Sequence, residues 1–177
     1  MTSLDRPLAP NPYDLLPPVP SFILESDDLQ DGQALPPLHS AEGGNVSPHL
    51  RWSDFPEETQ SFVVSCFDPD APTPSGWWHW TIVDLDASTT ELTQGQGGSD
   101  LLLDGAAFHL RVDHGGAEYF GAAPPPQDRP HRYIFAIHAL DVETLGIDDE
   151  ATPAECAFHL AFHTIARATL TATYAIA

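Results

Sequence analysis

The chain has 177 residues and a mass of 19.2 kDa, which is enough for one domain with its own core and too few for two ordinary domains. It carries 26 acidic residues against six basic ones, all six of them arginines, and a formal charge of −20. A field of that sign repels phosphate backbones and anionic lipid surfaces, which excludes general nucleic-acid and membrane-surface binding.

The chain begins with a proline-rich stretch. Six of the first 20 residues are prolines, which predicts an extended arm over residues 1–20 that either lies on the body or extends into solvent, followed by a domain over 21–177. The arm has no basic stretch followed by an apolar one, so no secretory signal is expected. No segment approaches the roughly 18 apolar residues of a membrane span. A cytoplasmic protein without an integral membrane segment is therefore expected.

Short apolar runs separated by turn signals predict that the body is mostly β. The predicted strands are Ser21–Glu25, Leu50–Trp52, Ser61–Phe67, Trp78–Leu85, Ala106–Val112 and His131–Leu140. The last of these is apolar on both alternating faces beyond its first two residues, which is typical of a central strand covered on both sides. Residues 91–104 are rich in Gly and Asp and predict a loop.

One long helix is predicted near the C-terminus. Thr152 followed by Pro153 is a helix start, and Glu155 completes a capping box. Apolar residues recur at helical spacing to about Ala168; they are Phe158, Ala161, Phe162 and Ile165. Residues 169–176 alternate and predict a final strand. The predicted fold is an antiparallel β-sandwich or barrel with one C-terminal helix packed on a side.

The cysteines and the helical histidines predict neither a disulfide framework nor a metal site. Cys66 and Cys156 lie in apolar runs, where a buried reduced thiol is expected. His159 and His163 are four residues apart on the predicted helix but lack a third ligand nearby in the sequence. No cofactor and no metal are expected.

Four segments carry unusual chemistry: Asp68–Pro72, Gly76–Trp80, Tyr119–Pro126 and His131–Tyr133. If 61–67 pairs antiparallel with 78–85, Asp68 and His79 share one rim of the sheet. His131 and Tyr133 are two residues apart and project from the same face of their strand, with Arg132 on the opposite face. A carboxylate, two imidazoles and a phenol then converge.

Each segment also has a structural interpretation. In the structural interpretation, Asp68–Pro72 is simply a turn capped by an Asp side chain, and His79 is a core histidine bound to a backbone carbonyl. Arg132 is expected to be a structural ion-pair partner, with Asp70 as the candidate acid. No nucleophile-elbow pattern supports a Ser-His-Asp triad.

Taken together, and with the stretch Asn45–Trp52 (NVSPHLRW), these segments resemble the phosphatidylethanolamine-binding protein family, in the bacterial branch often called Raf kinase inhibitor-like proteins. The resemblance covers about Ser21 to Tyr174. It implies a β-sandwich with a small anion-accepting pocket formed by Asp68, His79, His131 and Tyr133. Tyr119 and Gly121 match the aromatic residue and the glycine before the family's proline run.

The resemblance also implies details of the pocket walls. The predicted ligand-binding set is Asp68, His79, His131, Tyr133, Tyr119, Gly121, Asp70, Pro72 and Trp78. The Ala71-Pro72 bond is expected to be cis. The chain departs from the commoner family form at Ala122, where Gly-Pro is usual, and at Gln127, where Gly often follows the prolines.

The predicted function is non-catalytic binding of a small phosphate-bearing, phosphoethanolamine-like ligand. One acid beside two imidazoles favours a zwitterionic or monoprotonated ligand. A hydrolase using His79 or His131 as general base with Asp68 is the alternative, and a protease inhibitor using 121–130 is a weaker one. The resemblance leaves an unidentified protein partner and a homodimer open, because bacterial relatives include dimers. Kinase inhibition does not carry over, since a partner surface lies outside these motifs.

Overall fold

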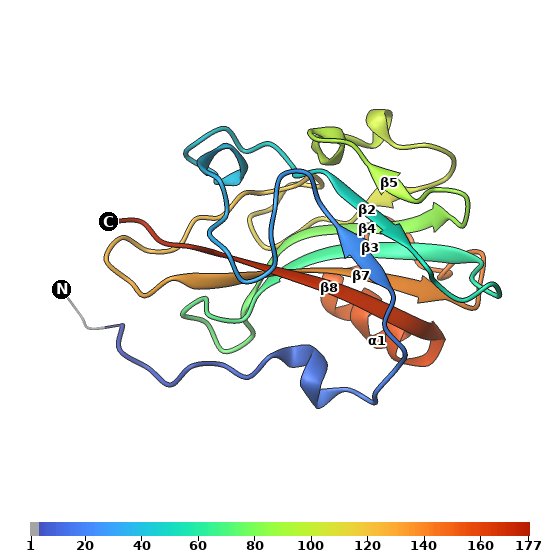
Figure 1. Cartoon of the computed structure of the whole chain (residues 1–177), viewed down its shortest axis with the longest axis horizontal. Helices are drawn as coiled ribbons and strands as arrows, with labels where there is room; N and C mark the ends of the chain where they lie inside the picture. Colours follow the sequence, from blue (N-terminus) through green and yellow to red (C-terminus); the bar gives the residue numbers. More distant parts are fainter. Residues whose placement is uncertain (1–3) are drawn as a thin grey trace.

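The computed structural model describes residues 4–177 and contains two antiparallel sheets packed face to face (Figure 1). A five-stranded sheet has the order β6-β4-β3-β7-β8, and a three-stranded sheet has the order β1-β2-β5. The elements are β1 (Ile23–Glu25), β2 (Leu50–Ser53), β3 (Ser61–Asp68), β4 (Trp77–Asp86), β5 (Glu91–Leu92), β6 (Phe108–His109), β7 (His131–Leu140), α1 (Pro153–His163) and β8 (Thr164–Tyr174). Four short 3₁₀ turns are η1 (Pro12–Leu15), η2 (Pro37–His39), η3 (Gln96–Gly98) and η4 (Asp100–Leu102).

The main core lies between the two sheets. Trp52 of the small sheet packs edge-on against Phe62 of the large one at 5.5 Å between ring centroids, and Phe135 of β7 is fully buried in the same core cluster. Each such side chain stabilises the fold by about 1.5–3 kcal/mol through removal from water. A second cluster on the outer face of the large sheet places Cys156 and Leu160 of α1 over neighbouring strands. The predicted sandwich with one C-terminal helix is confirmed.

Strand register brings the predicted site residues to one end of the large sheet. β3 ends at Asp68 while its antiparallel partner β7 begins at His131. Between β3 and β4 the register changes from Cys66↔Trp80 to Phe67↔Trp78, so β4 carries one extra residue there. A bulge of this kind bends the strand and re-aims side chains, and the extra residue is His79.

Several predicted bounds are wrong: the first strand begins at Ile23, the final strand spans Thr164–Tyr174, and the predicted loop 91–104 contains β5, η3 and η4. Two further differences have a clear cause. The strand predicted over 106–112 pairs only at Phe108–His109, because the chain turns back on itself directly afterwards, with the Val112 and Gly116 backbones hydrogen-bonded. The helix predicted to reach about Ala168 ends at His163. Thr164 is already paired with Leu140 of β7, since β-branched residues such as Thr164 and Ile165 suit a strand better than a helix.

The apolar residues that indicated the helix do not form the buried face of α1. Phe158 and Phe162 are 66% and 68% exposed, while Cys156 and Leu160 face the sheet. Both sets follow helical spacing, so periodicity alone does not tell which faces the core. The predicted N-cap is present, because the Thr152 hydroxyl accepts a hydrogen bond from the Glu155 N–H at 3.1 Å.

Cys66 and Cys156 are both buried free thiols, as predicted.

The described part of the arm, residues 4–20, lies against the same outer sheet face as α1. Tyr13 packs on the His138 ring at 5.8 Å, and its hydroxyl lies 3.3 Å from the Ser65 Oγ atom. Arg167 of β8 lies over the Tyr13 ring at 5.0 Å. Figure 1 shows this arm in blue, running beside the body toward the end where the C-terminus lies. Within residues 4–177, no helix is both long and apolar enough to cross a membrane.

Candidate functional site

A cavity of about 230 Å³ opens where β3 ends and β4 and β7 begin. It is lined by Asp68, Ala71, Pro72, Thr73, Trp77, His79, Phe120, Ala123, Pro125 and His131. The structure therefore brings four of the predicted residues to one cavity: Asp68, Pro72, His79 and His131. Its walls are mostly apolar, so the few polar groups act in a weakly screened environment.

Asp68 organises this end of the sheet. Its carboxyl is buried, at 2% residue exposure. One oxygen, Oδ1, accepts hydrogen bonds from the N–H groups of Asp70 and Ala71 at 2.7 and 3.0 Å, which makes the side-chain-capped turn. The other oxygen, Oδ2, lies 2.7 Å from Nδ1 of His131. Asp68 thus shapes one wall and orients one imidazole at the same time.

His131 is held between two carboxylates. Its Nδ1 atom lies 2.7 Å from Asp68 Oδ2 and its Nε2 atom 2.9 Å from Asp128 Oδ2. Only the protonated imidazolium can donate from both nitrogens. Burial works against this charged form, but the hydrogen bonds to Asp68 and Asp128 outweigh it and raise the pKa of His131. The two carboxylates therefore favour the charged form of this buried ring at the cavity wall, and Nη2 of Arg6 lies 3.4 Å from the same Nε2 atom.

His79 has the opposite character. Its Nδ1 atom lies 2.8 Å from the Phe120 carbonyl, and its ring makes an edge contact with the Tyr133 ring at 5.0 Å. Burial lowers the pKa of His79, although the Phe120 carbonyl partly opposes this. A neutral ring that donates from Nδ1 keeps a lone pair on Nε2. His79 consequently offers the cavity a hydrogen-bond acceptor.

Tyr133 lies behind the cavity rather than in its lining. It is 1% exposed, and its hydroxyl has no well-formed hydrogen bond to the residues that the structure describes. Burial, reinforced by the charge of Asp68, raises the pKa of the Tyr133 phenol. Tyr133 therefore contributes a buried phenol whose ring is in edge contact with the ring of His79.

Asp70 points away from the cavity. Its carboxylate oxygens accept from Nε and Nη2 of Arg132, each at 2.8 Å, and from the Arg132 backbone N–H at 3.0 Å. Burial would raise the pKa of Asp70, but these hydrogen bonds from Arg132 outweigh it and lower the pKa. The predicted structural ion pair is confirmed, and its partner is Asp70.

Three further predicted residues support the cavity without lining it. Gly121 donates its N–H to Asn45 Oδ1 at 2.7 Å, and an added Cβ there would approach backbone atoms of residues 39 and 40 to 2.5 Å. Tyr119 is buried and donates its hydroxyl to the His39 carbonyl at 2.7 Å. The ring of Trp78 packs at a tilt against Phe67, with ring centroids 4.6 Å apart. They fix the walls from behind.

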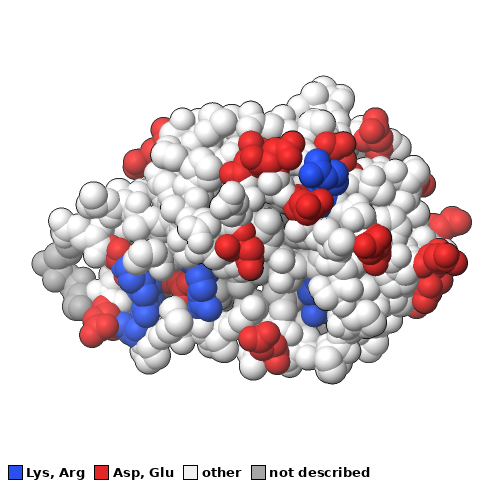
Figure 2. Space-filling view, viewed as in Figure 1, with Lys and Arg blue, Asp and Glu red and all other residues white. Residues whose placement is uncertain are grey.

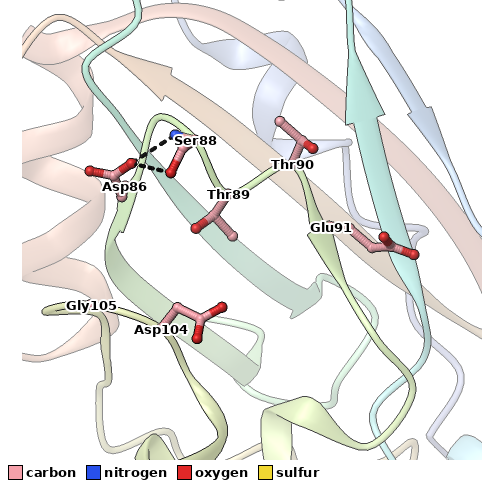
Figure 3. Close-up of a pocket in the computed structure, with 7 residues that line it drawn as sticks. All are labelled: Asp86, Ser88, Thr89, Thr90, Glu91, Asp104 and Gly105. Atoms are coloured by element: carbon pink, nitrogen blue, oxygen red, sulfur yellow. Dashed lines mark hydrogen bonds between the residues drawn. The ribbon is translucent and has the colours of Figure 1, made fainter.

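A larger hollow elsewhere has no comparable chemistry. A groove of about 650 Å³ is lined by Asp86, Glu91 and Asp104 among others. Figure 3 shows that these three carboxylates stand apart, and that Asp86 accepts hydrogen bonds from the N–H and the hydroxyl of Ser88. Across residues 4–177, no group of three or more His, Cys, Asp or Glu side chains is arranged to hold a metal ion. The polar, buried and convergent groups are those of the smaller cavity.

Comparison with known proteins identifies the family. The family model described as phosphatidylethanolamine-binding protein matches residues 25–175. The chain belongs to the phosphatidylethanolamine-binding protein family. The UPF0098 protein YbhB of Escherichia coli is 47% identical over 156 residues, which are 85% of this chain and 98% of the relative. These bacterial relatives confirm the predicted bacterial branch.

Solved structures of the phosphatidylethanolamine-binding protein family agree with the fold. The crystal structure of E. coli YbcL, described as a new member of the mammalian family, matches with a TM-score of 0.86 and 40% identity over 89% of this chain and 99% of that one. A Chlamydia trachomatis homologue, CT736, matches with a TM-score of 0.74 and 30% identity over 87% of this chain and 97% of that one.

One expectation carried over from the phosphatidylethanolamine-binding protein family is wrong. No cis peptide bond occurs among residues 4–177, so the Ala71-Pro72 bond is trans. The chain still reverses here, because Asp68 caps the turn and the Thr73 N–H donates to the Ala71 carbonyl at 2.7 Å.

Sequence reasoning also missed several residues of this site. Trp77, Phe120 and Pro125 line the cavity; they stand inside the singled-out segments but were not selected. Asp128 and Arg6 carried no signal in the sequence, yet Arg6 binds Asp128 at 2.9 Å. Figure 2 shows basic side chains gathered at this end of the molecule, while acidic side chains and two further basic ones are scattered over the rest of this face.

Proposed function

We propose that this member of the phosphatidylethanolamine-binding protein family is a non-catalytic binding protein for a small phosphate-bearing ligand of the phosphoethanolamine type. Proteins of this family are generally non-enzymatic binding proteins. The observation that carries the proposal is the pairing, in one cavity, of a cationic imidazole on His131 with a neutral imidazole acceptor on His79.

The two imidazoles select complementary ligand atoms. An anionic ligand oxygen can take the hydrogen bond that Nε2 of His131 makes with Asp128 within the protein. Nε2 of His79 accepts a hydrogen bond, so it favours a ligand atom that carries a proton, such as the O–H of monoprotonated phosphate or an ammonium group. A phosphoethanolamine-like molecule provides both kinds of atom.

The size and walls of the cavity suit a headgroup. Its volume of about 230 Å³ is below the roughly 300–1,000 Å³ of pockets for drug-sized ligands. Pro72, Trp77 and Phe120 line it with apolar surface, which weakens solvent screening and strengthens each charge–charge contact. A small polar group bearing a short substituent fits this description.

The two alternative functions have less support. Both nitrogens of His131 are held by carboxylates, so it has no free lone pair with which to act as a general base. His79 keeps a lone pair, but Asp68, the carboxylate expected to orient it as a base, binds His131 instead, and Nδ1 of His79 binds the Phe120 carbonyl. A hydrolase that works through a covalent intermediate also needs a nucleophile. The hydroxyl of Thr73, which lines the cavity, instead donates to the Gly76 carbonyl at 2.6 Å. The segment 121–130 is fastened to the body through Asp128 and Arg129, unlike the free loop that a protease inhibitor needs.

Isothermal titration calorimetry with phosphoethanolamine and with inorganic phosphate tests the proposal. We expect His131→Gln and His79→Gln each to weaken binding at least about tenfold, the value of a hydrogen bond to a charged group. His159→Gln on α1, remote from the cavity, is the matched control and should bind like the unmodified protein. Unchanged affinity in both site variants, or hydrolysis of a phosphoester panel that His79→Gln abolishes, would contradict the proposal.

The pH dependence is a second arm of the same experiment. Affinity should fall as pH rises through the raised pKa of His131, because the cation that attracts the anion is lost. Phosphate becomes a dianion over the same range and loses the proton that His79 accepts. Binding that strengthens steadily toward high pH would rule out this mode of recognition.

A further inference from the structure

The Nε2 atom of His131 is already occupied within the protein. It lies 2.9 Å from Oδ2 of Asp128, and the Asp128 side chain is 6% exposed. A carboxylate oxygen at this distance from an imidazolium N–H takes the place that an anionic ligand oxygen would need. The protein thus places an anionic group of its own at the cationic ring of the cavity.

The N-terminal arm holds that carboxylate in place. Arg6 binds it with two hydrogen bonds, from Nη2 to Oδ2 at 2.9 Å and from Nη1 to Oδ1 at 3.2 Å. The same guanidinium donates to the Asp70 carbonyl in the turn that forms the cavity wall. A two-pronged contact of this type fixes orientation as well as position, so Arg6 determines where the carboxylate of Asp128 stands.

Two other arginines fasten the arm by its backbone. Nη2 of Arg129 donates to the carbonyls of Arg6 and Pro7 at 2.6 and 3.3 Å. Nη2 of Arg132 donates to the Ala9 carbonyl at 2.6 Å. Three of the six arginines of the chain are therefore used to close this stretch of arm over Asp128.

We propose that Asp128 is an internal occupant of the anion position at His131, that Arg6 latches it there, and that a phosphate ligand must displace this carboxylate and loosen the arm. The inference rests on the proposed function and adds its regulation. Ligand and arm then exclude one another. The apparent affinity is lower than the intrinsic one by the fraction of molecules in which the latch is open.

The loop that carries Asp128 is suited to such a displacement. Gln127, the residue before it, has a φ of 65°, in the left-handed region that residues other than glycine seldom adopt. The side chain of Gln127 is exposed, and its N–H donates to the Ile176 carbonyl at 2.9 Å. Outward movement of the loop therefore breaks this hydrogen bond but does not take the Gln127 side chain out of the core. Asp128 can therefore leave His131 while β7, which begins three residues later, stays in place.

Calorimetry of charge-neutral variants tests the latch with inorganic phosphate and phosphoethanolamine as probes. In mild acid, about pH 5–6, the imidazole of His131 stays charged even without Asp128. There Asp128→Asn and Asp128→Ala should bind about tenfold more tightly than the unmodified chain, as expected if the latch is closed in about nine molecules of ten. Glu143→Gln, which removes one exposed negative charge at the far end of β7, is the matched control and should leave affinity unchanged.

A double-variant cycle shows whether Arg6 acts through Asp128. Arg6→Gln should tighten ligand binding in the unmodified background, because it releases Asp128. It should leave the affinity unchanged in the Asp128→Asn background. Arg51→Gln, at an exposed arginine with only long ion pairs, serves as the control. Equal effects of Arg6→Gln in both backgrounds would mean that Arg6 acts on the ligand without Asp128 and would overturn the latch.

Hydrogen exchange of the arm supplies a readout that needs no variant. Saturating phosphoethanolamine should increase deuterium uptake in the peptide covering residues 4–13, because displacement of Asp128 loosens Arg6. If the unmodified chain binds phosphate while Asp128→Asn and Asp128→Ala bind no more tightly and arm exchange is unchanged, the latch is wrong and the binding function stands. If none of these proteins binds either probe, both proposals are wrong.

Discussion

Nδ1 of His131 lies 2.7 Å from Oδ2 of Asp68, and this contact joins the first residue of β7 to the last residue of β3. Both side chains are almost fully buried. A buried pair of this kind gains its charge–charge attraction only while both partners remain, since removing one leaves the other charge without compensation.

Asp68→Asn is expected to lower the free energy of unfolding by about 3 kcal/mol, the usual cost of breaking a buried ion pair by removing one partner. The pKa of His131 should fall at the same time, because one of the two carboxylates that favour its charged form is gone. Urea unfolding and an NMR titration of the imidazole measure the two effects. Asp104→Asn in the open groove is the control, and an unmoved His131 titration would contradict the assignment.

His138 predicts how stability depends on pH in acid. Burial lowers its pKa to about 3, and the charge of Arg167 acts in the same direction. The unfolded chain has the ordinary value of about 6.5, so between these two values the unfolded state binds more protons than the folded state. The stabilisation is fully present above about pH 6.5 and is lost by about 1.4 kcal/mol per pH unit on acidification.

Unfolding free energies of the unmodified protein and of His138→Gln, measured between pH 4 and 7, should therefore converge as the pH falls. Carboxyl groups titrate equally in both proteins, so the difference in slope reports His138 alone. His159→Gln should run parallel to the unmodified protein. Parallel curves for His138→Gln as well would show that the folded protein accepts a proton at His138 as readily as the unfolded chain does.

Tyr13 predicts how much the arm contributes to stability. Its ring contacts His138 at 5.8 Å and lies under Arg167. Tyr13→Ala should lower the free energy of unfolding by about 2 kcal/mol, because it uncovers apolar surface on the sheet. Leu15, on the same arm but 71% exposed, is the matched control, and Leu15→Ala should change stability by no more than about 0.5 kcal/mol. Equal effects of the two substitutions would mean that the arm is not packed on the sheet.

Gly121 predicts how closely the cavity wall is built. A Cβ there would approach the His39 carbonyl oxygen and the Ser40 carbonyl carbon to 2.5 Å. Gly121→Ala should cost about 1–3 kcal/mol in free energy of unfolding, because backbone atoms on both sides would have to move apart. At Gly98 an added Cβ has nothing within 4 Å, so Gly98→Ala should be nearly neutral. Thermal unfolding of both variants decides whether the segment can shift at no cost.

The sequence alone determined the central strands and the end of the sheet at which the polar residues of the site lie. β7 was predicted with its observed bounds, His131–Leu140, because a strand covered on both faces leaves a continuous apolar run. The pairing of Asp70 with Arg132 also followed from residue types and from the alternation of side chains along a strand. These features depend on contacts between neighbouring strands, which local patterns describe well.

Only the tertiary structure decided which groups meet at the cavity and which side of α1 is buried. Arg6 and Asp128 are 122 residues apart in the chain, and neither belongs to a periodic pattern. Phe158 and Phe162 have the same helical spacing as a buried stripe, but α1 turns Leu160 toward the sheet instead. Periodicity fixes the spacing of a face, whereas the facing partner is chosen by the packing of segments distant in sequence, and no local pattern records that choice.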